Sequence, residues 1–252
     1  MQDRVTSDIG APDLLSDWHS IDWGTVSQKV TNLRQRIYRA TQEGRWNQVR
    51  SLKKLLMRSY SNLLLSTRRV TQDNPGKRTA GVDGQTARTP EARVQVVREM
   101  QTYHLGRVKP ARRVYIPKAN RKRRPLGIPI IKDRIAQAVV KNALEPAWEA
   151  SFEASSYGFR PGRSCHDAIE HAWVRLNAHG GHAWVLDADI TGAFDNIGHD
   201  FILNALGATP GRGWIHAWLN AGYVEADIFH VTESGTPQGG VITPPTIVQK
   251  EW

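Results

Sequence analysis

The stretch Ala183-Trp184-Val185-Leu186-Asp187-Ala188-Asp189-Ile190-Thr191-Gly192-Ala193-Phe194-Asp195 decides how the second half of this 252-residue chain is expected to fold. Its first eight residues predict a β-strand over 183–190, because alternation places Asp187 and Asp189 on one face and apolar side chains on the other. Small residues then end the strand in a turn. A carboxylate at a strand end can hold a divalent metal ion for phosphoryl transfer, but an ordinary acid in a turn explains the spacing equally well.

The chain before this stretch predicts two amphipathic helices, each with an apolar stripe and a basic outer face. In the first helix, which starts at Thr25, apolar residues recur at spacings of four, three and four, and the second repeats the pattern from Trp46 to Leu63. Turn-forming residues over 73–90 then end this helical region. This turn segment is the best candidate for a domain boundary.

Three further elements are predicted between this boundary and the acidic stretch. Apolar residues on both sides of the polar bend 118–124 predict a β-hairpin with a long basic tip. A helix is expected over 135–148, and Pro146 should end or bend it. Ser164 and Asp167 match a capping box, and an apolar stripe behind them predicts another helix.

Together these elements predict an α+β fold, with a helical N-terminal region followed by a mixed domain. The boundaries that we expect are a disordered lead-in over 1–16, a helical domain over 17–100, a mixed domain over 101–244 and a separate tail over 245–252. The chain is long enough to build hydrophobic cores of this kind.

The charge of the chain predicts an acidic polymer as its partner. The formal net charge is +10, and residues 29–78 hold thirteen Lys or Arg against two acids, while 107–132 hold ten and no acid. Basic tracts of this density are typical of a nucleic-acid footprint, with a solvated basic face as the plainer alternative. Four basic residues of these tracts are candidate contacts to RNA: Lys53, Lys54, Arg112 and Arg113.

The single cysteine and the first residues of the chain indicate in which cellular compartment the protein is expected. Cys165 excludes an intrachain disulfide and a cysteine-based zinc finger, and we expect it to be a small buried packing residue in a reducing compartment. The first residues fit neither a signal peptide nor a transit peptide, and no stretch is apolar enough to span a membrane. A cytoplasmic protein that is not secreted is the expectation.

Seven motifs follow one another in an order that resembles the reverse transcriptase domain of group II intron-encoded proteins. The resemblance covers nearly the whole chain. It implies the fingers and an incomplete palm of a right-hand polymerase fold. The motifs that carry it are Asp17-Trp18-His19-Ser20-Ile21-Asp22-Trp23, Thr79-Ala80-Gly81-Val82-Asp83-Gly84, Val114-Tyr115-Ile116-Pro117-Lys118, Arg124-Pro125-Leu126-Gly127-Ile128-Pro129, Ser156-Tyr157-Gly158-Phe159-Arg160-Pro161-Gly162-Arg163-Ser164, the acidic stretch Asp189 to Asp195, and Gly235-Thr236-Pro237-Gln238-Gly239-Gly240.

The resemblance implies an RNA-directed DNA polymerase that uses Mg²⁺ or Mn²⁺, dNTPs, and an RNA template with a DNA primer, and that binds group II intron RNA. Asp189 aligns with the first metal-binding aspartate, and the carbonyl of Ile190 with the adjacent ligand. Phe194 resembles the aromatic gate that rejects the ribose 2′-hydroxyl, with an ordinary core aromatic as the alternative. Lys118 and Arg124 resemble the residues that grip the triphosphate, although generic contact to a phosphate backbone is an equal alternative.

The remaining motif residues carry less definite roles. Gln238 resembles the residue that packs beside the incoming nucleotide, and the alternative is a simple glycine turn. Arg160 and Arg163 resemble positions near the template and the nucleotide pocket, but solvated basic residues are equally consistent with this segment. Asp187 does not match a metal ligand of the family.

The resemblance is lost at about Pro244, before the Tyr-Ala-Asp-Asp hairpin that carries the second catalytic aspartate in this family. No Asp-Asp pair occurs in the 252 residues. We therefore expect an N-terminal fragment with an incomplete two-ion site, and little or no polymerisation by this chain alone. The alternatives are a non-catalytic, maturase-like RNA-binding module and an inactive product of a disrupted reading frame.

Overall fold

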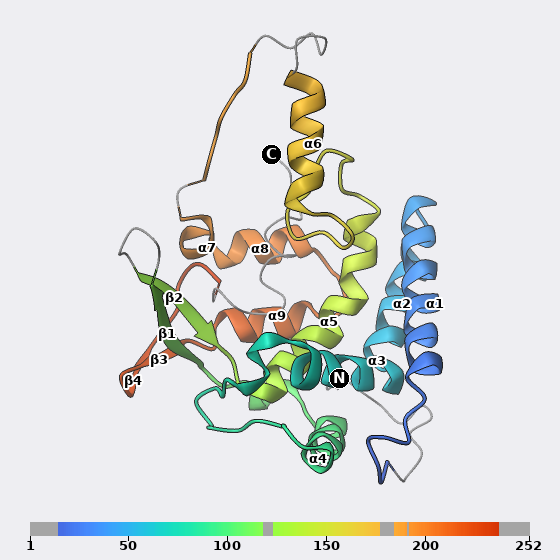
Figure 1. The fold of residues 1–252 in the computed structure, drawn as a ribbon, viewed down its shortest axis with the longest axis vertical. Helices are drawn as coiled ribbons and strands as arrows, with labels where there is room; N and C mark the ends of the chain where they lie inside the picture. The colour runs from blue at the N-terminus through green and yellow to red at the C-terminus, as the bar shows by residue number, and fades with distance from the viewer. Residues whose placement is uncertain (1–14, 118–122, 177–183, 191, 237–252) are drawn as a thin grey trace.

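The computed structural model describes residues 15–117, 123–176, 184–190 and 192–236. Its centre is α5 (Ile131–Glu149), which packs against α1 (Trp23–Gln42), α2 (Trp46–Met57) and α3 (Tyr60–Arg68) (Figure 1). Sixteen of the nineteen α5 residues are buried. The helical region predicted at the N-terminus is therefore present, and α5 forms its core.

The first predicted helix is confirmed, and the second is divided. Asp22 caps α1 by accepting a hydrogen bond from the backbone N–H of Thr25 at 3.1 Å. The second apolar stripe is broken at Arg58 and Ser59, because the Ser59 side chain caps a new helix, α3, by accepting from the Asn62 N–H. A short π-helix, Arg69–Asp73, follows α3.

Pro146 was expected to end or bend this helix, and it does not end it, because α5 continues to Glu149. A proline leaves the carbonyl four residues earlier without its helical N–H donor. Here the carbonyl of Asn142 instead accepts a hydrogen bond from the Arg34 guanidinium at 3.2 Å, and the same guanidinium is 2.6 Å from the Glu145 carboxylate. The contact with α1 therefore replaces the donor that the proline lacks.

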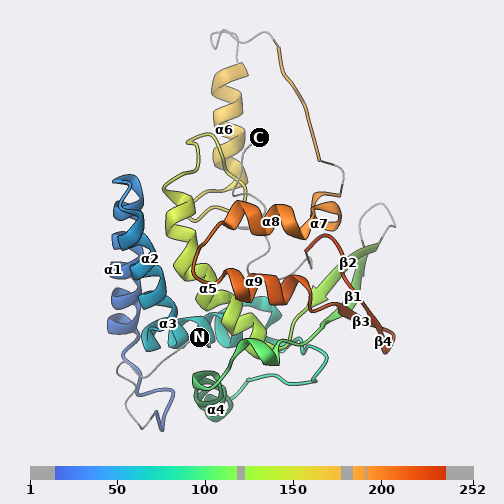
Figure 2. The same cartoon turned by 180° about the vertical axis from the view of Figure 1, so that it is seen from behind.

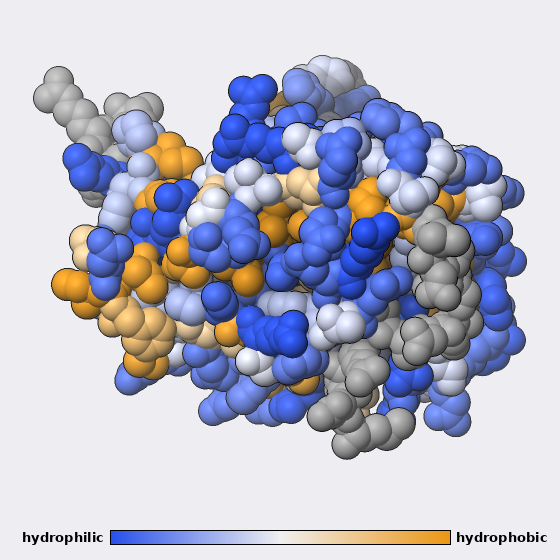
Figure 3. All heavy atoms as spheres, turned by 90° about the horizontal axis from the view of Figure 1, so that it is seen from below, coloured by the Kyte–Doolittle hydropathy of each residue, from blue (hydrophilic) through white to orange (hydrophobic). Residues whose placement is uncertain are grey.

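A mixed four-stranded sheet lies on the opposite side of α5, in the order β2-β1-β3-β4. The predicted hairpin is confirmed as β1 (Ala111–Pro117) and β2 (Arg123–Ile128), which pair antiparallel. Strand β3 (Tyr223–Glu225) runs parallel to β1 and turns back into β4 (Ile228–His230). Viewed from below, the surface is mostly hydrophilic, and hydrophobic residues gather on the side of the sheet (Figure 3).

The remaining helices connect the sheet to the helical core. Helices α8 (His199–Leu206) and α9 (Arg212–Leu219) lie side by side (Figure 2), and α4 (Pro90–Gln101) packs against α3. Asp133 of α5 is fully buried and accepts hydrogen bonds from the Tyr103 hydroxyl at 2.6 Å, the Lys109 N–H at 3.2 Å and the Trp218 indole at 3.3 Å. One carboxylate therefore ties α5 to the end of α4, the entry to β1, and α9.

Helix α6 (Cys165–Leu176) and residues 184–190 project from this body and are called the arm below. The predicted capping box is confirmed, because the Asp167 carboxylate accepts from the Ser164 N–H and the Asp167 N–H donates to the Ser164 hydroxyl. None of the α6 residues is buried, and Cys165 is exposed, so its expected burial is wrong.

The predicted strand over 183–190 is also not observed: residues 184–190 have no regular secondary structure, and all are exposed. A strand needs neighbours that satisfy its backbone N–H and C=O groups. Among the residues that the structure describes, no strand pairs with this segment. None of the described helices combines the length and the apolarity needed for a membrane span.

Candidate functional site

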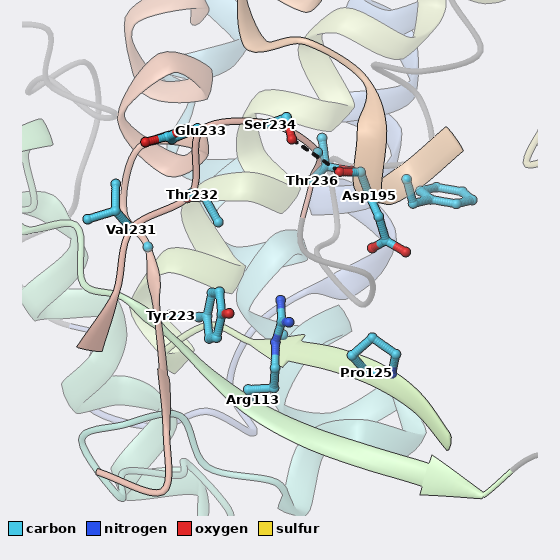
Figure 4. A pocket seen from close by; sticks show the side chains of 13 residues that line it. Arg113, Pro125, Asp195, Tyr223, Val231, Thr232, Glu233, Ser234 and Thr236 are labelled. Atoms are coloured by element: carbon cyan, nitrogen blue, oxygen red, sulfur yellow. Dashed lines mark hydrogen bonds between the residues drawn. The ribbon is translucent and has the colours of Figure 1, made fainter. Parts of the chain in front are cut away.

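A cavity of about 410 Å³ lies between the β1–β2 hairpin, β3, the short helix α7 (Ala193–Asn196) and the segment 231–236 (Figure 4). Four parts of the chain therefore line one space, and three of them, the hairpin, α7 and the segment 231–236, contain motif residues, whereas the part at β3 lies outside the motifs. The residues that line it are Arg113, Pro125, Gly127, Phe194, Asp195, Gly222, Tyr223 and Val231 to Thr236.

The segment 234–236 is fixed to the turn that carries Phe194. The Thr236 N–H donates to the Phe194 carbonyl at 2.7 Å, and the Gly235 N–H donates to the Ile197 carbonyl at 2.8 Å. Gly235 has a φ of +75°, and a Cβ at this position would lie 2.6 Å from the Asp195 carbonyl oxygen. Only glycine fits here, so the start of the Gly235 to Gly240 motif is held against the acidic motif.

His199 adds a side-chain contact to this junction. The residue is buried at the start of α8, and its Nε2 lies 2.9 Å from the Gly235 carbonyl oxygen. A backbone bridge between Gly198 and Ser234 joins the same two segments. The sequence offered no signal for this pair, because the two residues are 36 positions apart and His199 lies outside the motifs.

Arg113 supplies positive charge to the cavity from the face of the sheet that borders it. Its guanidinium lies 3.6 Å from the centre of the Tyr223 ring, a cation–π geometry, and its side chain points between Tyr223 and Pro125 (Figure 4). Its Nε is buried and has no hydrogen-bond partner in the part of the chain that the structure describes. The Asp195 carboxylate also lines the cavity from the opposite wall. The cavity therefore has the Arg113 guanidinium, which can donate further hydrogen bonds, on one side and the Asp195 carboxylate on the other.

Phe194 is half-buried, and its ring packs edge-to-face against Phe159 at 6.2 Å. The aromatic contact holds the ring at the cavity without enclosing it in the core. The half-buried ring is compatible with both interpretations of Phe194, the gate and the core aromatic. Its role as a gate stays a prediction.

The hairpin register decides which basic side chains share the cavity face. Arg113 pairs with Gly127, and Arg124 pairs with Ile116, one position out of step with the cavity-lining residues. Because side chains alternate along a strand, Arg124 lies on the opposite face from Arg113, whereas Arg123 shares the face of Pro125. The order of the motifs assigned neither Arg113 nor Arg123 to this face of the hairpin, although strict alternation along the strands is a sequence signal that places both on it.

The other residues predicted for nucleotide and metal binding are not brought into the cavity by the described chain. Lys118 and Gln238 lie outside the described residues. Asp189 and Ile190 lie in the exposed segment 184–190. Within the described part of the chain, no group of three or more His, Cys, Asp or Glu residues is arranged to hold a metal ion.

Arg160 and Arg163, predicted near the template, form bonds within the chain. Arg160 is buried, forms an ion pair with Glu149 and donates to the Ser156 carbonyl at 2.8 Å. Arg163 donates to the Ala154 carbonyl at 3.1 Å. The bonds of both guanidinium groups therefore stabilise the 150–164 loop.

The basic residues predicted to contact RNA occupy two places. Arg112 is half-buried on the face of β1 that points away from the cavity. Lys53 is 8% exposed, and its Nζ donates to the Thr209 hydroxyl at 3.2 Å, while the neighbouring Lys54 is exposed. Burial lowers the pKa of the Lys53 ammonium to about 8.

Comparison with known families accounts for the arrangement of these motifs. A family model for reverse transcriptase (RNA-dependent DNA polymerase) matches residues 116–249, more than half of the chain, and a model for the N-terminal domain of reverse transcriptase matches residues 18–100. The chain belongs to the reverse transcriptase family. In this reverse transcriptase chain β2, the α7 turn and the segment 231–236 fall within the first match, whereas most of β1, including Arg113, lies before it.

Individual relatives link the chain to intron-encoded proteins. It is similar to protein YkfC of Escherichia coli (strain K12), with 39% identity over 192 residues, covering 72% of this chain and 50% of YkfC. The group II intron-encoded protein LtrA of Lactococcus lactis subsp. cremoris is 36% identical over 190 residues, 73% of this chain and 29% of LtrA. Nuclear intron maturase 1, mitochondrial, of Arabidopsis thaliana is 37% identical over 78 residues, 31% of this chain and 10% of that protein.

The resemblance to group II intron-encoded reverse transcriptases and maturases is therefore confirmed, as is the α+β fold. The chain spans about half the length of YkfC and less than a third of the length of LtrA.

Proposed function

We propose that this chain forms the nucleotide-holding and RNA-holding part of an RNA-directed DNA polymerase of a group II intron. The observation that carries the proposal is the cavity in which the hairpin, the Phe194 turn and the Gly235 segment meet. The division into a helical domain over 17–100 and a fingers and partial palm domain over 101–244 is part of it.

In this proposal Arg113 and Arg123 offer cations to the triphosphate from the sheet face, since guanidinium groups bind phosphate oxygens with two parallel hydrogen bonds. Phe194 limits the space beside the sugar. Lys118 and Gln238 are proposed to contribute to the same site, because in the sequence Lys118 comes directly after β1 and Gln238 comes two residues after Thr236.

Asp189 and the carbonyl of Ile190 are the proposed ligands for Mg²⁺, with Mn²⁺ as a substitute, because both offer the hard oxygen donors that these ions prefer. When bound, the ion supplies charge neutralisation at the triphosphate. One carboxylate and one carbonyl provide only part of a two-ion site, and the 252 residues contain no Asp-Asp pair. On their own, these residues are proposed to bind substrates with little or no extension.

The second candidate function is splicing-related RNA binding without polymerisation. The two basic tracts favour it, as does the similarity to a protein named an intron maturase. It differs from the first proposal in one respect: it requires no nucleotide in the cavity.

The test is dNTP binding by this chain, measured by filter binding with labelled dATP in Mg²⁺, for wild type, Arg113→Ala and Arg112→Ala. These neighbours have the same charge and lie on opposite faces of β1, so they are a matched pair. Arg113→Ala is expected to weaken binding roughly 10-fold, and Arg112→Ala much less. Equal effects would contradict the cavity assignment, and binding of RNA but no dNTP by the wild type would favour the second candidate.

Primer extension with an RNA template and a DNA primer completes the test. Extension at background level, together with measurable dNTP binding, is the expected result. Extension that Asp189→Ala abolishes would show that these residues suffice for catalysis and that the expected inactivity is wrong.

A further inference from the structure

A second surface, remote from the cavity, carries a regular row of basic residues along α2. The row repeats every four residues, so its side chains lie on one face of the helix about 6 Å apart along the axis. Neither α2 nor residues 207–213, which lie opposite, contain an acid. The basic members of the row are Arg50, Lys54 and Arg58, the last of which directly follows α2, and Trp46 precedes them at the same spacing.

Two adjoining cavities, of about 350 and 470 Å³, lie between this row and the loop that joins α8 to α9. Both are lined by Arg50 and by Ala208, Thr209 and Pro210, so they form one continuous groove, which we call the α2 groove. Trp46 lies at one end, and Arg58 and Arg212 lie at the other.

Lys53 lies within this groove as a buried charge that has no counter-ion among the described residues. Only 8% of the residue is exposed, and its Nζ has one acceptor in the structure, the Thr209 hydroxyl. Burial lowers its pKa, and no acid in the described chain acts against this effect. An ammonium group has three donors, and burying it without an anion costs free energy. The fold therefore maintains an unfavourable charge that an anion in the groove would compensate.

We propose that the α2 groove is a binding site for the phosphodiester backbone of single-stranded RNA, with Lys53 at its centre. The cations are spread along the length of α2, which suits a chain of phosphates better than one ion. Trp46 is 64% exposed at the end of the groove and offers a ring on which a base stacks.

The opposite wall adds to the positive potential. Helix α9 begins at Arg212 in this wall, and no side chain caps its N-terminus at Gly211. Free N–H groups and the helix dipole at such an end attract anions. Gly211 itself is held close to Val140 and Met57, which fixes the wall against α5 and α2.

The experiment measures RNA binding and thermal stability of the whole chain for wild type, Lys53→Met and Lys29→Met. The probe is a single-stranded RNA of about 12 nucleotides, titrated over a KCl series. Lys53→Met removes the charge at nearly constant length, and Lys29→Met removes an exposed charge from α1, outside the groove.

The expected result for Lys53→Met is an affinity roughly 5- to 10-fold lower, a slope of log K against log salt smaller by about 0.7, and a higher melting temperature. Lys29→Met should change the affinity less and leave the melting temperature near that of wild type. RNA binding with wild-type affinity and slope in Lys53→Met would overturn the proposal.

Two further arms keep the outcome interpretable. If Lys53→Met melts below wild type, the exposed pair Arg50→Gln and Lys54→Gln decides, and unchanged RNA affinity in that variant overturns the proposal. Inorganic phosphate at matched ionic strength should raise the melting temperature less than the RNA does, and equal stabilisation would assign the groove to free phosphate.

This inference rests on the proposed RNA partner, but the two fail in different ways. A wild-type chain that binds no RNA contradicts the proposed function. A wild-type chain that binds RNA equally well without Lys53 contradicts only the groove.

Discussion

The helical body around α5 and the arm have equally clear local sequence signals but opposite degrees of burial. Ile135 of α5 is 0% exposed, whereas Trp173 of α6 is 69% exposed and Trp184 is 93% exposed. Both regions have helix caps and apolar stripes that match the period of a helix. The difference shows that periodicity and capping specify a helix, while burial depends on which other elements reach its apolar face.

Truncating one apolar residue in each of the two regions should give the largest contrast in the free energy of unfolding. Ile135→Ala is expected to lower the free energy of unfolding by about 2–5 kcal/mol, because it opens a cavity in the core. Trp173→Ala should change it by less than about 1 kcal/mol, since the ring is mostly exposed. Urea denaturation of both variants measures the difference. A loss at Trp173 as large as that at Ile135 would show that the arm is packed against the body.

The buried carboxylate of Asp133 should make the stability of the body depend on pH. Burial raises its pKa from 3.8 to about 6, so the folded state binds a proton more tightly than the unfolded chain does. This contribution is present at low pH and is lost as the pH rises from about 4 to about 6, by about 3 kcal/mol. Chemical denaturation across this range, with Asp133→Asn as control, measures it. An Asn variant that keeps the same decline would assign the decline to other groups.

Lys53 should have the opposite effect on stability within the same body. Its folded pKa of about 8 lies below the ordinary 10.5, so the penalty for its charge is fully present below pH 8 and disappears as the pH rises towards 10.5. Lys53→Met should therefore raise the free energy of unfolding by about 1–3 kcal/mol at pH 7. Thermal and urea unfolding measure this, with Lys29→Met expected within about 0.5 kcal/mol of wild type. A destabilised Lys53→Met would mean that the ammonium is already compensated.

The smallest expected effect is local to the arm. Ser164→Ala removes the α6 cap and should cost that helix about 1 kcal/mol. Because no α6 residue is buried, amide hydrogen exchange in α6 should become roughly 5-fold faster while α5 amides stay unchanged. The exchange rate of α5 amides should change only if α6 packs on the core. A changed rate in α5 would therefore contradict the separation of the two regions.

The sequence predicted the elements whose signals are local. The first helix, the hairpin on both sides of 118–124 and the Ser164 capping box all formed as expected, because neighbouring residues determine them. The strand over 183–190 did not form among the described residues, since a strand depends on a partner that its own sequence does not specify. Pro146 failed as a helix end for a similar reason, because Arg34, more than a hundred residues away, supplies the missing donor.

The candidate site likewise contains residues that the motifs predicted and residues that only contacts between distant segments bring there. Motif order identified the segments that meet at the cavity, and Phe194 and the Gly235 segment lie together there. Arg113, Tyr223 and His199 were not assigned to this site, since their places follow from strand register and from contacts between distant segments. Lys118 and Gln238 lie outside the described residues, so their roles stay predictions.

The central claim is that the cavity between the hairpin, the α7 turn and the 231–236 segment holds the incoming nucleotide. Photocrosslinking with 8-azido-dATP in Mg²⁺, followed by peptide mapping, tests it most directly. The account predicts crosslinks to peptides that contain the hairpin, the Phe194 turn or the Gly235 segment, and predicts that unlabelled dATP removes them. Crosslinks confined to α1, α2 and α3, or crosslinks that unlabelled dATP does not remove, would contradict it.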